Sequence, residues 1–178
     1  MNRRVGIALT ALALAGVLMG CGKRDPAATT ASDAPTGDSI TCELAPRARC
    51  RAANLAGADL SGHDLSGIDL RSADLSGAKL AGTNLTDANL IGADLSSADL
   101  IGAALVRAAL DDADLSGASL YGARLTSAKV RNAVLADANL TNAFATDADF
   151  TGSTGANLSA IFACNTTMAD GEVEAPTC

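Results

Sequence analysis

A large apolar residue recurs at every fifth position from Leu55 to Phe150, so that residues 53–152 form twenty consecutive five-residue units. This central residue is Leu in 17 of the 20 units, and the residue two places before it is Ala in 17. The residue just before the centre is Asp or Asn in 12 units. The residue two places after the centre is Gly, Ser, Asn or Asp in every unit except the one with Arg107. The pattern therefore predicts two inward positions and one bend per unit.

A period of five excludes both regular secondary structures for these units. On an α-helix, five residues advance by about 500°, so successive leucines would share no face. On a flat strand, side chains alternate with a period of two, so successive leucines would fall on opposite faces. A chain that bends once per unit, at the position rich in Gly, Ser, Asn and Asp, keeps every Leu and Ala inside. We therefore predict a coil with an apolar interior and polar walls.

The composition indicates a thin interior instead of an ordinary globular core. Hydrophobic residues make up 48% of the 178 residues, but the chain contains only three Phe, one Tyr and no Trp. The formal net charge of −7 argues against a nucleic-acid binder, which needs a basic face. The sequence has one His, and no phosphate-binding glycine loop, HExxH motif or catalytic carboxylate pair stands out in it. We therefore expect no enzymatic activity and no cofactor.

The first twenty residues have the organisation of a secretory signal peptide. Two arginines precede a fifteen-residue apolar run that is short for a membrane-spanning helix. The sequence Leu18-Met19-Gly20-Cys21 resembles the lipobox of bacterial lipoprotein precursors, which implies cleavage before Cys21 and lipidation of that cysteine. Several acyl chains give stable membrane anchoring. The resemblance thus implies a lipid-anchored protein of the bacterial cell envelope that faces the periplasm, and Gly22 favours the outer over the inner membrane.

A polar segment separates the predicted lipidation site from the repeat. Residues 22–41 are rich in Ala, Thr, Ser, Asp and Pro and contain one large apolar residue, so they bury too little surface to fold alone. Together with Cys21 they are predicted to form a lipidated N-terminus and flexible tether, residues 21–41. The twenty residues after Cys21 reach at most about 70 Å and average about 25 Å as a coil. The mature chain has 11 basic and 20 acidic residues, so we expect anionic lipid headgroups to repel it.

The repeated unit resembles that of the pentapeptide-repeat family. The sequence Ala-Asp-Leu-Ser-Gly at residues 58–62, 73–77 and 113–117 matches the family pattern, and the match continues over all twenty units. The resemblance implies an all-β fold, a right-handed quadrilateral β-helix with four units per coil and about five coils. Five coils at strand spacing make a rod about 24 Å long. The open ends of such a solenoid need caps, which we expect at residues 42–52 and, with a tail, at residues 153–178.

Four cysteines flank the repeat in the mature chain, in addition to Cys21. Export to an oxidising compartment permits disulfides. The two ends of a rigid rod are too far apart for a bridge, which needs Cα atoms within about 7 Å. We therefore expect pairing within each cap, Cys42 with Cys50 and Cys164 with Cys178. The spacing of these cysteines and the single His make a metal site the weaker alternative.

Two features inside the repeat have both a functional and a structural interpretation. His63 occupies an inward position where most units have Ala, so it is either a base or ligand, or a bulky residue that the first coil tolerates. Asp74, Asp94 and Asp114 fall twenty residues apart and would stack on one wall. Such a column either holds divalent cations or consists of solvated carboxylates that cap turns. We favour the structural interpretation in both cases and predict no metal.

Outward positions with large apolar side chains form a possible interaction patch, with Ile101 and Tyr121 as vertical neighbours in one column. The predicted patch consists of Ile91, Ile101, Val106, Tyr121 and Phe144.

The sequence supports two functional hypotheses. The first is a lipid-anchored, non-enzymatic solenoid that acts as a structural or protein-interaction module in the cell envelope, with an unidentified envelope protein as its partner. The alternative follows from the family resemblance, because some pentapeptide-repeat proteins imitate duplex DNA and bind DNA gyrase. The acidic surface suits this alternative, whereas the export signal and the flanking cysteines oppose it.

Overall fold

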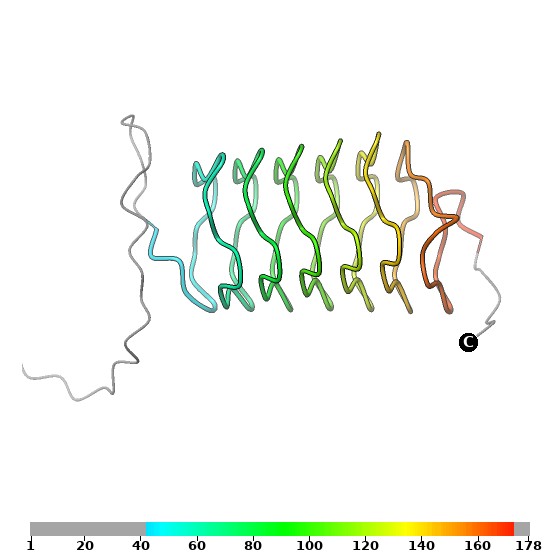
Figure 1. The fold of residues 1–178 in the computed structure, drawn as a ribbon, viewed down its shortest axis with the longest axis horizontal. Helices are drawn as coiled ribbons and strands as arrows, with labels where there is room; N and C mark the ends of the chain where they lie inside the picture. Colours follow the sequence, from blue (N-terminus) through cyan, green and yellow to red (C-terminus); the bar gives the residue numbers. More distant parts are fainter. Residues whose placement is uncertain (1–41, 173–178) are drawn as a thin grey trace, which may run out of the picture.

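The described part of the chain is a rod of stacked coils that advance along one axis (Figure 1). A computed structural model describes residues 42–172. The predicted signal peptide, Cys21, the tether and Cys178 lie outside the described residues. Among residues 42–172 there is no helix, and therefore none that is long and apolar enough to cross a membrane.

Parallel bridges between residues twenty positions apart hold the coils together. Arg49 pairs with Asp69, Asp69 with Asn89, and the same column continues to Asp149. Every bridge is a single residue, placed just before the centre of its unit, and no longer strand occurs within residues 42–172. Because twenty residues are four units, each coil has four walls, and the five coils predicted for residues 53–152 are confirmed. We number the walls by their centres: wall 1 contains Leu70, wall 2 Leu75, wall 3 Leu80 and wall 4 Leu85, and residues twenty apart share a wall.

The backbone of each unit is satisfied partly by the neighbouring coils and partly by its own turn. Leu75 N donates to Asp94 O at 2.7 Å, and Asp94 N donates back to Ala73 O at 2.9 Å. Within the same coil, Ala78 N donates to Leu75 O at 3.0 Å and closes a four-residue turn that leads into the next unit. Gly77, the third residue of this turn, has a φ of 61°, and the residue before it does not have a positive φ, which is the signature of a type II turn. This turn chemistry explains the Gly, Ser, Asn and Asp that the sequence places there.

The interior consists of the predicted Leu and Ala positions. The Leu centres from Leu60 to Leu140 are at most 2% exposed, whereas Leu55, in the first coil, is half-buried. Each buried Leu contributes about 1.5–3 kcal/mol of transfer free energy. The exceptions to Ala also fit inside: Ile68 is fully buried, and the buried Thr83 hydroxyl donates to Leu60 O at 2.7 Å. An inward hydroxyl is thus accommodated where a backbone carbonyl oxygen accepts its hydrogen bond.

The coil begins two units before the recognisable repeat. Arg47 N donates to Ser66 O, Arg49 bridges to Asp69, and Cys50 is a buried centre on wall 1. Most of the expected cap at residues 42–52 therefore already belongs to the first coil. The repeat is hard to recognise there because Ala45 and Cys50 replace the Leu centres.

The β-helix also continues beyond residue 152, but its last coil is two residues shorter than the others. Phe144 bridges to Phe162 and Asp149 to Thr167, so the register falls from twenty residues to eighteen. Three residues, 153–155, replace one full unit on wall 2, and three units follow at 156–160, 161–165 and 166–170. Much of the expected C-terminal cap is therefore repeat. With these additions the rod has about six and a half coils and is roughly 30 Å long at strand spacing.

Candidate interaction surfaces

Aspartates on the walls fix the turns that follow them. Oδ1 of Asp74 accepts hydrogen bonds from Ser76 N at 3.0 Å and from the Ser76 hydroxyl at 2.7 Å. In the next coils, Asp94 and Asp114 each accept from a backbone N–H two residues later at 2.9 Å. The hydroxyl of Ser76 and its N–H hold the pKa of Asp74 below its usual value, and Ser116 has the same effect on the pKa of Asp114.

These turns assign the aspartate column a local structural role. Bridges join Asp74 to Asp94 and Asp94 to Asp114, as the sequence predicts. Within residues 42–172, no group of three or more His, Cys, Asp or Glu side chains has a geometry that could hold a metal ion. The carboxylates are instead directed at their own turns.

Ion pairs between coils neutralise part of the acidic surface. Arg107 binds both carboxylate oxygens of Asp87 at 2.7 Å, one coil away. Arg131 makes the same bidentate contact with Asp111 at 2.7 and 3.0 Å. Each arginine holds the pKa of its partner aspartate below the usual value. Because these arginines are exposed, such pairs contribute little to stability, but they interrupt the negative charge along the rod.

An exposed aromatic strip runs along wall 4 and the corner between walls 3 and 4. We define it as Ile101, Tyr121, Phe144 and Phe162, which are 45–55% exposed. The rings of Phe144 and Phe162 stack with centroids 5.0 Å apart and an interplanar angle of 21°. Gly102 N donates to Tyr121 O, so Ile101 and Tyr121 follow one another at the same corner in successive coils, and Asn142 Nδ2 donates to Tyr121 Oη at 3.0 Å. The strip thus consists of two neighbouring pairs, Ile101 with Tyr121 and Phe144 with Phe162, and one polar group, the Tyr121 hydroxyl.

The structure brings together three of the five residues of the predicted patch. Ile101, Tyr121 and Phe144 belong to the aromatic strip. Val106 is half-buried at the other edge of wall 4, and Ile91 is half-buried at the corner diagonally opposite the strip. Ile91 is therefore not part of the same surface.

Phe162, the most exposed of the large apolar residues in the described chain, was missed by the sequence interpretation. The two-residue deletion at 153–155 takes its unit out of the twenty-residue register, so Phe162 does not align with Phe144 by simple counting. Allowing a shift of two residues after Gly152 would have placed both rings in one column.

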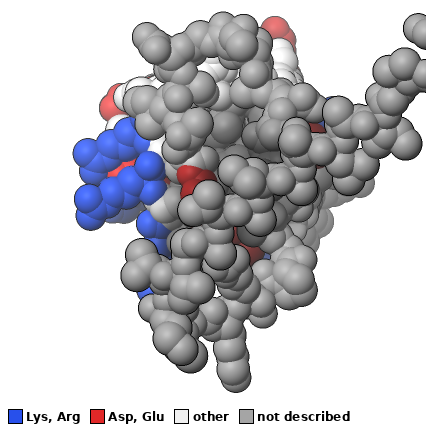
Figure 2. Space-filling view, turned by 90° about the vertical axis from the view of Figure 1, so that its left-hand side faces the viewer, with Lys and Arg blue, Asp and Glu red and all other residues white. Residues whose placement is uncertain are grey.

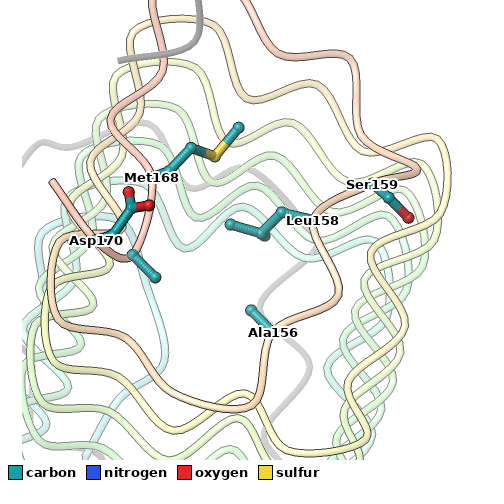
Figure 3. A pocket seen from close by; sticks show the side chains of 6 residues that line it. Ala156, Leu158, Ser159, Met168 and Asp170 are labelled. Atoms are coloured by element: carbon teal, nitrogen blue, oxygen red, sulfur yellow. The ribbon is translucent and has the colours of Figure 1, made fainter. Parts of the chain in front are cut away.

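The C-terminal end of the described rod is hollow. A cavity of about 400 Å³ is lined by six residues, and Leu158 and Met168 extend toward one another across it (Figure 3). The lining residues are Ala156, Leu158, Ser159, Met168, Ala169 and Asp170. Leu158 and Met168 are centres of the last short coil, so the hollow is the interior of the β-helix at the end of the described residues.

Both ends of the rod contain a disulfide-bonded cysteine. Cys42 and Cys50 form a disulfide with Cα atoms 5.3 Å apart, which confirms the predicted pairing. Cys164 is also disulfide-bonded. Its predicted partner, Cys178, lies outside the described residues, so that pairing stays a prediction.

His63 lies half-buried at its inward position. Its Nδ1 is 3.2 Å from the carbonyl oxygen of Ser61, a contact within its own turn. The side chain thus fits the interpretation of a bulky residue tolerated in the first coil.

The comparison with protein families identifies the repeat. The family model described as pentapeptide repeats (8 copies) matches four overlapping segments of the chain, residues 48–87, 78–117, 88–126 and 118–159. This chain belongs to the pentapeptide-repeat family. Proteins of this family are generally structural or interaction modules. The comparison with curated protein sequences found no significant match.

Solved structures share the architecture. A pentapeptide-repeat protein of the Arabidopsis thaliana thylakoid lumen is 36% identical with a TM-score of 0.56, over 58% of this chain and 72% of that chain. A trypsin-treated form of QnrB1, a plasmid-mediated fluoroquinolone resistance protein, is 18% identical with a TM-score of 0.50, over 72% of this chain and 77% of that chain. The fold is therefore the right-handed quadrilateral β-helix of this family.

Proposed function

We propose that this protein is a lipid-anchored, non-enzymatic solenoid that binds a protein partner in the bacterial cell envelope through the aromatic strip. The signal-peptide pattern and the lipobox-like sequence before Cys21 support the anchor. The Cys42–Cys50 disulfide is consistent with an oxidising compartment.

The aromatic strip is the observation that carries the interaction role. Tyr121, Phe144 and Phe162 are each about half exposed, although the chain has only four aromatic residues in total. Exposed aromatic side chains are typical of interaction sites, where Tyr and Phe supply large contact areas. In contrast, several wall and corner aspartates are occupied by turn hydrogen bonds or by ion pairs between coils, such as Asp74 and Asp87.

The anchor is tested by the intact mass of the protein extracted from the membrane fraction, before and after reduction. We expect the mass of residues 21–178 plus acyl groups, and an increase of about four hydrogens when two disulfides are reduced. An unprocessed, fully reduced chain in the cytosol would overturn the envelope role.

The strip is tested by site-specific photo-crosslinking in the native envelope. A photoreactive residue at Phe144 should capture a discrete partner band, and the same residue at Val134 should not. Val134 is a matched control because it is 40% exposed and also precedes a centre, but lies on wall 2. Equal yields from both positions would contradict the assignment of the strip.

The DNA-gyrase alternative makes a different prediction. A DNA mimic needs a continuous negative surface, whereas the pairs of Arg107 with Asp87 and Arg131 with Asp111 interrupt the negative charge on this rod. Residues 21–178 should therefore fail to inhibit DNA supercoiling by purified gyrase. Inhibition, together with a cytoplasmic location, would favour the alternative.

A further inference from the structure

The N-terminal end of the rod differs in charge from the rest of the described chain. Residues 42–52 contain three arginines and one glutamate, whereas residues 53–172 contain 15 acidic and six basic residues. Viewed at this end, blue side chains gather on one side of the molecule (Figure 2). We call Arg47, Arg49 and Arg51 the arginine edge.

The arginine edge lies on one wall of the first coil. Arg49 occupies the outward position of wall 1, and Arg47 and Arg51 occupy the turns on either side of it. All three are exposed. The edge is therefore a short, one-sided row of positive charge at the end from which the chain leads back to the predicted lipidation site.

The carboxylates around the arginine edge leave most of its charge uncompensated. Arg51 pairs with Asp69 at 2.6 Å, but Asp69 also binds Arg71 through two contacts at 2.9 Å. Arg47 also helps to lower the pKa of Asp87, but the carboxylate of Asp87 is hydrogen-bonded to Arg107 and is not paired with Arg47. Glu43 is exposed, and within residues 42–172 no salt bridge joins Arg47 or Arg49 to a carboxylate.

We propose that the arginine edge docks the rod end-on to an anionic lipid surface. The proposal rests on the proposed lipid anchor, since the anchor keeps this end close to the bilayer. Basic side chains near an anionic membrane gain favourable energy that decays within a Debye length, about 8 Å at physiological ionic strength. The edge lies within this range when the rod stands on its N-terminal end or rests on wall 1, and the 15 acidic against six basic residues at 53–172 disfavour the second orientation.

The tether makes a weak contact sufficient. With residues 21–41 as the predicted tether, the domain is held within about 25 Å of the bilayer and experiences an effective surface concentration in the millimolar range. The acidic walls are repelled by the same lipids, so the two charge distributions favour an upright orientation over one in which the rod lies flat. The net negative charge by itself predicts only repulsion from the lipid. Combined with the arginine edge, the same charge favours one orientation of the rod.

The first experiment separates the edge from the anchor. Residues 21–178 with Cys21→Ser, which cannot be lipidated, are mixed at low ionic strength with vesicles of phosphatidylethanolamine and phosphatidylglycerol, or of phosphatidylcholine alone. We expect salt-sensitive binding to the anionic vesicles only. Replacing Arg47, Arg49 and Arg51 by Gln should weaken the binding by about fivefold per arginine, on the order of 100-fold in total.

Two matched variants control this experiment. A variant with Gln at Arg107, Arg124 and Lys129 loses the same number of positive charges further along the rod and should bind at nearly the parental strength. A variant with Lys at all three edge positions should also retain binding, because the attraction depends on charge. The proposal is wrong if the Cys21→Ser chain does not bind anionic vesicles. It is also wrong if Gln at Arg47, Arg49 and Arg51 and Gln at the three control positions reduce the affinity equally.

The second experiment measures the orientation of the anchored protein. The chain contains no Trp, so a single introduced Trp is a unique fluorophore. Ser61 and Thr141 are both exposed and share the corner between walls 3 and 4, but lie four coils apart, about 19 Å at strand spacing. Brominated anionic lipid should quench Ser61→Trp and leave Thr141→Trp bright. Equal quenching would refute the upright orientation, whereas a missing acyl mass would refute the anchor alone.

Discussion

Gly155 offers a sharp test of how the rod ends. It occupies the place on wall 2 where earlier coils have Leu, at the point where the register shortens from twenty to eighteen residues. A Cβ atom on Gly155 would lie 2.8 Å from Ala136 Cα and 2.9 Å from Ala136 N. These are backbone atoms of the preceding coil, which cannot rotate away. The chain can therefore cross the end of the coil only with glycine there.

The control for Gly155→Ala is Gly77→Ala. Both glycines have a positive φ, +75° and +61°, but a Cβ on Gly77 would meet nothing within 4 Å. The left-handed conformation costs Ala about 1–2 kcal/mol, of which about 0.4–1 is recovered because Ala restricts the unfolded chain. We expect a loss of about 1 kcal/mol for Gly77→Ala. Overpacking against Ala136 should add about 1–3 kcal/mol for Gly155→Ala.

The assay is urea unfolding combined with hydrogen exchange of single amides. Ala145, Asp147 and Phe150 donate their N–H groups to Phe162, Cys164 and Thr167 of the last coil, so these amides should exchange faster in Gly155→Ala. Amides of the central coils should keep their parental rates. If Gly155→Ala and Gly77→Ala differ by less than about 0.5 kcal/mol and exchange alike, the steric argument is refuted.

Three further predictions concern buried and charged groups. The hydroxyl of Ser153 is buried without a hydrogen-bond partner, so Ser153→Ala should stabilise the protein by about 1 kcal/mol in urea unfolding, and a loss of stability would reveal a partner. Cys42→Ala opens a disulfide with a sequence separation of 8 and should cost about 2.5 kcal/mol in urea unfolding; reductant should destabilise the parent more than the variant, because the bridge of Cys164 is present in both, and equal losses would contradict the assignment. The pKa values of Asp74, Asp111 and Asp114 are lowered in the fold, so their contribution to stability is complete above the unfolded value near 3.8 and is lost as the pH falls through the lower folded values. The melting temperature should therefore be nearly independent of pH between about 5 and 7 and fall below about pH 4. A melting temperature that began to fall near pH 6 would contradict this assignment.

The central coils were predictable because one local rule repeats twenty times without insertion or deletion. Each unit must place two side chains inside and bend once, and the residue types at those positions follow from burial and turn geometry. The number of units per coil came from the family resemblance and not from the spacing. The bridge between Asp74 and Asp94 confirms it.

The ends were less predictable because packing there no longer requires the repeat residues. Cys50 fills a Leu position through its disulfide, and Thr166 occupies an inward position because its hydroxyl donates to Ala145 O. Either substitution hides the pattern while it preserves the coil. The residues of the aromatic strip were only partly predictable from the sequence, because Phe162 follows the two-residue deletion and no longer aligns with Phe144 at a spacing of twenty.

The four-walled stack also works as an angular scale. Inserting twenty residues between Arg51 and Ile101 would move the aromatic strip along the axis by one coil, about 4.8 Å. Its angular position about the axis, relative to the arginine edge, would stay unchanged. Inserting five residues would instead swing the strip by a quarter turn at almost constant height. The number of whole coils inserted thus sets the axial position of a surface, and the number of additional units sets its angular position about the axis. A family built this way can re-aim a binding surface by duplicating short segments, without redesigning a core.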